Sequence, residues 1–248
     1  MKGSESSFLI PDWPAPVRVR AAMTTRLGGV SDGPYASFNL GRSCGDDPIA
    51  VAENRRRLRA ALPLPSEPCW LKQVHGAEVV RMPENASTPE ADASFTTKAG
   101  VVCLVQAADC LPVLLCDDAG TVVAAAHAGW RGLAAGVLEA TVRRLPVPPT
   151  DLMAWLGPAI GPTAFEVGPE VREAFVKTDA GADAAFRAGA GAKYFADLFV
   201  LARRRLATAG VTRVYGGGVC TVSDPARFFS HRRDRISGRM AALIWRAC

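Results

Sequence analysis

Three side chains of this sequence could together hold a metal ion. His75, Cys110 and His127 offer two imidazoles and one thiolate, a set that suits zinc and leaves a fourth position open for water or substrate. A metal held in this way acts as a Lewis acid and lowers the pKa of bound water. The ligands lie 35 and 17 residues apart, unlike a local HExxH or CxxC signature. The residues alone therefore leave an alternative, a buried cysteine beside two hydrogen-bonded histidines.

The same residues could work without a metal. Cys110 would be a thiolate nucleophile, and His127 or His75 would be its base. Asp109 or Asp92 would then orient the base. A cysteine with a spatially adjacent histidine is a frequent arrangement but a weak sequence signal. This interpretation predicts a Cys-His hydrolase or amidase.

Two arginines could bind an anion. Arg131 lies at the expected start of a helix, where free N–H groups favour a phosphate. Arg26 precedes the glycine pair Gly28–Gly29, whose backbone can approach a ligand closely. The alternatives are a packing role for Trp130 and a simple tight turn at the glycine pair. The third histidine, His231, is expected at the surface, and a pocket position is its alternative.

A hairpin is expected to bring Cys110 and His127 together. Residues 111–116 and 121–126 are both apolar and rich in strand-forming types, and Asp117–Gly120 is typical of the turn between them. Cys110 precedes the first strand, and His127 follows the second. The two side chains should therefore lie close together at one end of the hairpin.

The remaining elements indicate a mixed architecture. Asp47 and Pro48 are a typical N-cap and first residue for a helix that Pro63 stops. Patterns predict strands over residues 17–25, 101–106 and 152–156, and helices over 47–62, 133–144, 168–178, 195–209 and 237–246. We expect residues 1–16 to be loosely ordered and residues 180–193 to be mobile. Strands and helices without regular βαβ alternation favour an α+β fold.

Composition and charge indicate the number of domains, the partners and the cellular setting of the protein. The 248 residues are 49% hydrophobic, which suits a single domain over 1–248 with a real core. The net charge is +5, but the arginine clusters at 55–59 and 203–205 are expected on solvated helix faces, so no nucleic-acid partner is predicted. No apolar stretch reaches 18 residues, so no membrane partner is predicted either. Seven cysteines without a CxxC pair favour a reduced, cytoplasmic setting.

Eight short motifs, spread over nearly the whole chain, together resemble the laccase-domain family, the YfiH/YlmD-like proteins once described as polyphenol oxidases. Each motif alone is modest, and the ordered set is specific. The motifs are Thr24–Ser31 (TTRLGGVS), Tyr35–Gly41 (YASFNLG), Gly45–Pro48 (GDDP), Gln73–Gly76 (QVHG), Ala108–Cys110 (ADC), His127–Gly132 (HAGWRG), Leu156–Gly161 (LGPAIG) and Ser237–Met240 (SGRM).

The resemblance implies a fold, a metal and an activity. The fold is a mixed β-sandwich between helical layers, in the order α/β/β/α. The metal is zinc rather than copper, and its ligands fall on His75, Cys110 and His127, which are also the catalytic residues. The activity is phosphorolysis of adenosine, inosine, guanosine or methylthioadenosine, accompanied by adenosine deamination. Arg26, Asn39 and Arg131 are the candidate ligands of the purine nucleoside and of phosphate, and a monomer is expected.

One position departs from the family, and three other functions stay open. The family loop usually reads Gly-x-His-Val-Gly-Asp-Asp, so Ser43 replaces a pocket histidine and could alter substrate preference or rate. No HxE proton shuttle is present; Glu78 follows His75 by three residues, and no shuttle is assigned. The first alternative is the amidase, acting on a small molecule or a peptidoglycan precursor. A copper polyphenol oxidase would need roughly ten histidines, and this chain has three. A pure binding module is the third alternative.

Overall fold

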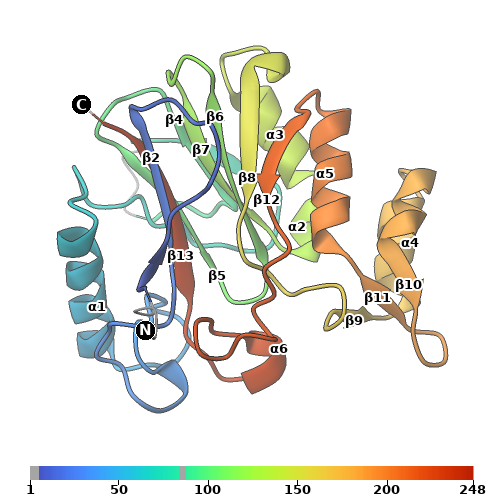
Figure 1. The fold of residues 1–248 in the computed structure, drawn as a ribbon, viewed down its shortest axis with the longest axis horizontal. Helices are drawn as coiled ribbons and strands as arrows, with labels where there is room; N and C mark the ends of the chain where they lie inside the picture. The colour runs from blue at the N-terminus through green and yellow to red at the C-terminus, as the bar shows by residue number, and fades with distance from the viewer. Residues whose placement is uncertain (1–5, 84–87, 248) are drawn as a thin grey trace, which may run out of the picture.

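Two β-sheets stacked face to face form the centre of the protein (Figure 1). The computed structural model describes residues 6–83 and 88–247. The smaller sheet has the order β1 (Phe8–Leu9), β2 (Val19–Thr24), β13 (Met240–Arg246) and β5 (Val102–Ala107). The larger sheet has the order β12 (Arg213–Gly216), β8 (Leu152–Leu156), β6 (Leu111–Asp117), β7 (Val123–Ala128), β4 (Ala93–Thr96) and β3 (Val79–Arg81).

Helices cover the two outer faces of this pair of sheets (Figure 1). Helix α1 (Pro48–Ala61) packs on the smaller sheet, and α2 (Trp130–Ala134), α3 (Val137–Arg144) and α5 (Leu198–Thr208) pack on the larger one. The four layers confirm the expected α+β fold and its α/β/β/α order. A side lobe holds α4 (Pro169–Val176) and a third sheet of β10 (Phe186–Ala188), β11 (Tyr194–Ala196) and β9 (Glu166–Val167).

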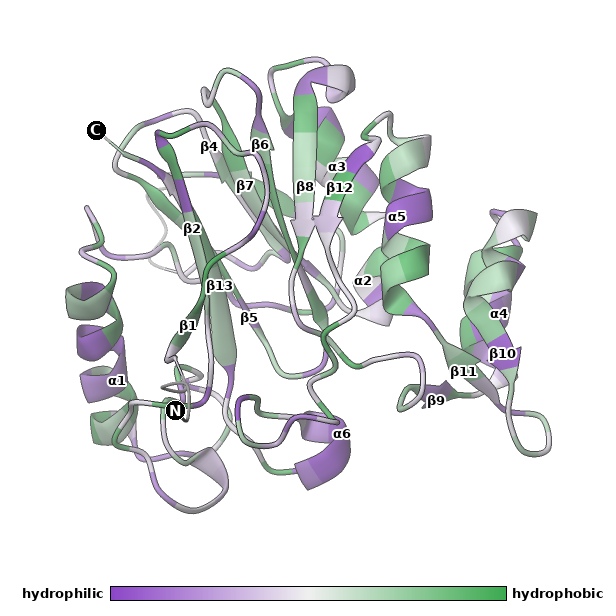
Figure 2. Cartoon of the chain, in the orientation of Figure 1, coloured by the Kyte–Doolittle hydropathy of each residue, from purple (hydrophilic) through white to green (hydrophobic). Residues whose placement is uncertain are grey.

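The strands at the centre are apolar because both of their faces are covered. Every residue of β6 and β7 is buried. Leu114, Met23 and Ile244 belong to the core between the sheets, whereas Leu115 faces the core under the helices. Strands covered on both sides appear in sequence as continuous apolar runs rather than as alternating ones. Figure 2 shows these central strands in hydrophobic colours, with hydrophilic residues on α1 and α6 (His231–Asp234).

The expected helix over residues 237–246 is wrong. Met240–Arg246 is strand β13, which pairs antiparallel with β2 on one side and with β5 on the other. Its first six residues are all buried, so its apolar positions reflect a strand covered on both faces. A short apolar run of this kind cannot be assigned to helix or strand by periodicity alone.

Three other expectations are corrected. The mobile segment expected at 180–193 is ordered, as a 3-10 helix at Ala180–Ala185 followed by the β10–β11 pair. In the expected loose start, Phe8 pairs with Thr24 in β2, while residues 1–5 lie outside the described ranges. The helix expected over 133–144 is two helices, because Gly136 adopts a φ of +89° between α2 and α3.

The other elements follow their sequence signals. Helix α1 starts at Pro48, and the Asp47 side chain caps it by accepting from the Ile49 N–H. The predicted hairpin is confirmed, with Leu111 opposite Ala128 and Cys116 opposite Val123. Within residues 6–83 and 88–247, no helix has the length and apolar character needed to cross a bilayer.

Candidate metal centre and cleft

His75, Cys110 and His127 converge on one point in the structure. Their potential ligand atoms all lie within 4.8 Å of one another. The Cys110 Sγ lies 3.8 Å from the Nε2 of His75, and the two imidazole rings have centroids 4.9 Å apart at an angle of 72°. Three side chains from distant parts of the sequence thus form a compact group of two nitrogens and one sulfur.

Asp92 holds both histidines of this group. Its buried carboxylate accepts hydrogen bonds from the backbone N–H groups of Val74 (3.1 Å), His75 (3.0 Å) and Gly76 (2.7 Å). The same carboxylate lies 2.8 Å from the Nδ1 of His127. With Nδ1 engaged, the Nε2 of His127 is the nitrogen left for a ligand. His75 itself adopts a φ of +62°, so this loop is fixed by the carboxylate rather than by a regular element.

Asp109 fixes the backbone that carries Cys110. Asp109 adopts a φ of +86°, and its carboxylate accepts from Thr221 Oγ1 (2.6 Å), Ser230 Oγ (3.0 Å) and the Arg232 N–H (2.6 Å). These bonds tie the end of β5 to the C-terminal segment. Of the two predicted orienting carboxylates, Asp92 therefore contacts a histidine, while Asp109 is engaged elsewhere.

Without a metal, the charges of Cys110 and His127 stabilise each other, which favours the thiolate and the imidazolium. Burial by itself would raise the pKa of the Cys110 thiol, but His127 and His75 outweigh it and lower that pKa to about 6. Burial would lower the pKa of His127, yet Cys110 and Asp92 raise it to about 9. The metal-free pair is thus a thiolate beside an imidazolium at neutral pH.

The residues present fit a metal ion. The donor set is the borderline-soft combination that zinc prefers, and a carboxylate orients one of the imidazoles from behind. Gly129 keeps the space beside the donors open, since a Cβ there would lie 2.7 Å from Cys110 Sγ and 3.3 Å from His75 Cδ2. The group therefore could bind a metal at three protein ligands.

The group opens into a cleft of about 1610 Å³ that is rich in cations. All three histidines of the chain line it. Its lining also includes two carboxylates, Glu67 and Asp109. The cationic side chains that line it are Arg42, Arg55, Arg56, Arg59, Lys72, Arg131, Arg232, Arg235 and Arg239. Such a concentration of one sign of charge raises the local concentration of anions.

Of the three predicted nucleoside and phosphate ligands, the structure brings Arg131 to this cleft. Its exposed guanidinium stacks over the Trp130 ring at 4.4 Å, and both residues line the cleft. Arg26 and Asn39 are not among the described lining residues. The buried Asn39 amide instead donates to Asp46 and accepts from the Gly41 and Arg239 N–H groups.

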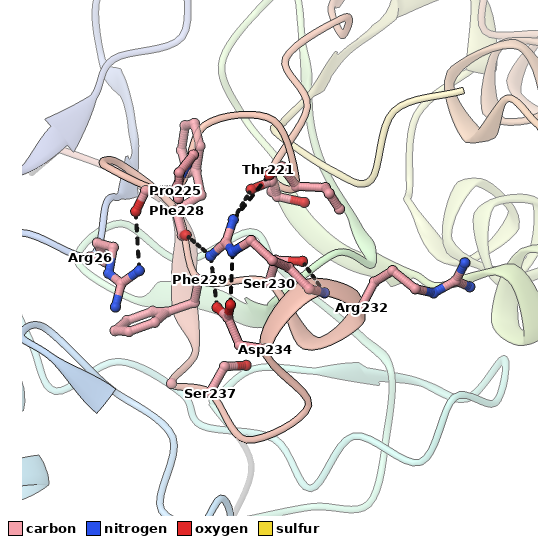
Figure 3. Close-up of polar contacts among 12 residues, drawn as sticks. Arg26, Thr221, Pro225, Phe228, Phe229, Ser230, Arg232, Asp234 and Ser237 are labelled. Atoms are coloured by element: carbon pink, nitrogen blue, oxygen red, sulfur yellow. Dashed lines mark hydrogen bonds and ion pairs between the residues drawn. The ribbon is translucent and has the colours of Figure 1, made fainter. Parts of the chain in front are cut away.

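The Arg26 guanidinium is used within the fold. It donates to the carbonyls of Ala36 (2.8 Å) and Pro225 (3.1 Å) and lies 4.7 Å from the Phe229 ring centroid. Figure 3 shows Arg26 turned toward Pro225, on the opposite side of the C-terminal segment from the Arg232 side chain. Arg232 in turn donates to the Glu166 carbonyl.

Sequence reasoning missed most of the cationic lining. His231 is exposed as expected, but it begins α6 and lines the cleft. Arg55 and Arg239 lie almost two hundred residues apart, so no local pattern links them. The one available signal was the SGRM motif around Arg239, which the fold joins to the YASFNLG segment through the Leu40 N–H bond to the Arg239 carbonyl.

Comparisons with known proteins agree with this fold. The signature of the family described as "Multi-copper polyphenol oxidoreductase laccase" matches residues 20–247. The Escherichia coli (strain K12) protein named "Purine nucleoside phosphorylase YfiH" is 56% identical, covering 97% of this chain and 99% of that protein. A Haemophilus influenzae protein named "Purine nucleoside phosphorylase" is 48% identical, covering 95% of this chain and 97% of that protein.

Solved structures show the same likeness. A Neisseria meningitidis protein has a TM-score of 0.95 and 51% identity, covering 98% of this chain and 100% of that chain. YlmD from Geobacillus stearothermophilus has a TM-score of 0.92 and 34% identity, covering 98% of this chain and 97% of that chain.

Proposed function

This chain belongs to the multi-copper polyphenol oxidoreductase laccase family, and from that premise we propose that it is a zinc-dependent purine nucleoside phosphorylase. The observation that carries the proposal is the His75, Cys110 and His127 group on the wall of a cationic cleft. The names of the relatives supply the reaction. The geometry supplies a place where a nucleoside and a phosphate anion could meet.

Zinc suits this site better than the copper of the family description. His75 Nε2, Cys110 Sγ and His127 Nε2 would hold it, with Asp92 fixing the His127 ring. A centre of several coppers demands roughly ten histidines, given the preference of copper for imidazole, and the whole chain has three. When bound, zinc supplies a positive charge and a Lewis acid beside the substrate.

Phosphorolysis places clear demands on the residues of the cleft. A phosphate oxygen attacks C1′ of the ribose while the bond from C1′ to the purine N9 breaks. The purine leaves with that electron pair and takes a proton, so the products are the free base and ribose 1-phosphate. Arg131 and Arg232, which line the cleft, would neutralise the phosphate charge, and the Trp130 ring would offer an apolar face to a base.

We also propose adenosine deamination at the same site. Water adds at C6 of the purine, ammonia leaves from C6, and inosine is the product. The supporting observation is the donor count, because a zinc held by His75, Cys110 and His127 would keep a fourth position for water. Conversion of adenosine to inosine without phosphate, lost on chelation, tests this activity.

A metal-free amidase is a second candidate, and the lowered pKa of Cys110 favours it. A thiolate of this kind could attack an amide carbonyl, with His127 returning a proton to the leaving amine. Its signature is activity that survives chelation and ignores phosphate. Such activity on a small amide or a peptidoglycan precursor would replace the phosphorylase proposal.

The test combines metal analysis with phosphate dependence. The purified protein is expected to hold about one zinc per chain and to release hypoxanthine from inosine only when phosphate is present. Cys110→Ala should lose both the zinc and the activity. Cys69→Ala, which alters a half-buried thiol that does not line the cleft, is the matched control and should keep both. Full phosphorolysis by metal-free protein would overturn the proposal.

Location and assembly stay proposals as well. The six cysteines within the described ranges are free, which supports the cytoplasmic setting. The expected monomer and the expected absence of nucleic-acid and membrane partners remain predictions.

A further inference from the structure

The cleft is larger than a nucleoside and a phosphate require. Small-molecule sites usually enclose about 300–1,000 Å³, whereas this cleft measures about 1610 Å³. The volume beyond the metal group extends to α1 and the loop before it, where Arg42, Arg55 and Arg239 line the cleft. This end holds charge that the reaction proposed above does not use.

Arg55 is a buried cation without a carboxylate partner among the described residues. The residue is only 8% exposed, and its guanidinium stacks on Trp70 with the Cζ 3.3 Å from the ring centroid. Nε and Nη2 both donate to the Leu40 carbonyl, at 3.0 and 2.8 Å. The nearby Glu67 carboxylate pairs with Arg59 instead. Burying a charge is costly unless a counter-ion compensates it, so this position favours an anion in the cleft.

A second cation lies beside Arg55. Burial and the positive charge of Arg42 together lower the pKa of Arg55 to about 10. Arg42 is exposed and lines the same part of the cleft. Two like charges repel each other unless an anion lies between them, and a phosphate accepts from two guanidinium groups at once.

The backbone around these arginines is fixed in place. The Asn39 side-chain oxygen accepts from the N–H groups of Gly41 (2.9 Å) and Arg239 (2.8 Å). A Cβ on Gly41 would lie 2.8 Å from the Arg239 Cγ, so glycine allows the close approach of the two segments. Preorganised groups of this kind bind a ligand without a large ordering cost.

This end of the cleft lies within reach of the metal group. Met240 pairs with Ala107 at the end of β5, and Cys110 follows three residues later. Arg239 directly precedes Met240, and both Arg239 and Cys110 line the same cleft. A single small ligand can therefore span from the metal group to these arginines.

We propose that Arg42, Arg55 and Arg239 form a second anion subsite that receives a phosphate carried by the substrate itself. Purine nucleoside 5′-phosphates then bind in the cleft in preference to uncharged nucleosides. The inference rests on the proposed function for the identity of the purine. The subsite itself is a property of binding and can be tested without turnover.

Calorimetry on the zinc-loaded full chain tests the subsite. Inosine and inosine 5′-phosphate are titrated in phosphate-free buffer, because neither proposed activity can then convert them. The 5′-phosphate is expected to bind at least about tenfold more tightly, as suits one charge-assisted contact. Arg42→Ala should remove most of that difference and leave inosine binding unchanged. Arg56→Ala is the matched control, since its guanidinium also lines the cleft but is neutralised by Glu53.

Several outcomes would overturn the subsite. One is equal binding of inosine and its 5′-phosphate. Another is an equal loss in Arg42→Ala and Arg56→Ala, which indicates a diffuse charge effect. A third is inorganic phosphate that binds at least as tightly as the 5′-phosphate and loses that binding in Arg42→Ala, which assigns the arginines to the free anion. Tight 5′-phosphate binding by a protein without phosphorolysis would instead refute the proposed function and retain the subsite.

Discussion

The Nδ1 of His127 lies 2.8 Å from the Asp92 carboxylate, the same group that binds three consecutive N–H groups around His75. One buried carboxylate thus sets the ring orientation of one donor and the backbone of another. Burial opposes the charged form of Asp92, but His127 and the N–H groups of Gly76 and Val74 outweigh it and keep the carboxyl pKa below its ordinary value. Two of the three donors of the metal group, His75 and His127, therefore depend on the Asp92 side chain.

Replacing Asp92 with asparagine should therefore weaken zinc binding by about 10- to 100-fold, the usual effect of losing a partner of a ligating histidine. The amide cannot accept from His127 and all three N–H groups with the same strength. Competition with a chromophoric chelator measures the affinity. A parallel thermal unfolding curve separates this effect from loss of the fold, and unchanged affinity in a folded variant would contradict the role of Asp92.

Cysteine reactivity should distinguish Cys110 from Cys103 and Cys116 in metal-stripped protein. Burial raises the pKa of Cys103 and of Cys116 to about 12, whereas the two histidines bring that of Cys110 to about 6. Because the lowered pKa leaves Cys110 as a thiolate above pH 6 and a thiol below it, alkylation should rise with pH through a midpoint near 6. Mass spectrometry after iodoacetamide treatment from pH 5 to 8 reports the labelled sites.

Zinc is the control for this labelling. Added zinc should protect Cys110, because the ligand sulfur is no longer free to react. Labelling of Cys110 with a midpoint near the ordinary thiol pKa would show that the histidines do not stabilise its thiolate.

Gly129 should tolerate no side chain. A Cβ there would lie 2.7 Å from the Cys110 Sγ, and its φ of −60° is ordinary, so the conflict is purely one of space. Gly129→Ala is expected to lose most zinc binding by displacing the thiol. Gly76→Ala is the matched control, because its Cβ would meet Asp92 and Val74 at an acceptable 3.6 Å. Equal zinc content in the two variants would argue against a crowded metal group.

Sequence alone could predict the parts of this protein that local chemistry determines. The 111–128 hairpin follows from apolar runs around the Asp117–Gly120 turn, and Asp117 accepts from the Thr121 and Val122 N–H groups there. The start of α1 follows from Asp47 and Pro48. The convergence of His75 with the hairpin rests on Asp92, a long-range contact that spacing does not reveal.

Other features depended on tertiary context. Residues 240–246 form an inner strand of the smaller sheet because β2 and β5 flank them, which a short apolar run does not reveal. Arg26 follows a glycine-rich pattern suited to an anion, yet the Ala36 and Pro225 carbonyls use its donors. The cationic cleft combines α1 with segments more than 170 residues later in the chain, beyond the reach of any local motif.

The interface between the two sheets should dominate stability. Leu114 on β6 is fully buried between them, so Leu114→Ala removes apolar contacts from both sheets and leaves a cavity. The free energy of unfolding should fall by about 2–5 kcal/mol. Ile49 on α1 is 77% exposed, so Ile49→Ala is the matched control and should change it by less than about 0.5 kcal/mol. Urea unfolding followed by tryptophan fluorescence measures both. A similar fall in the free energy of unfolding for the two variants would mean that the sheets do not pack as tightly as the burial of Leu114 indicates.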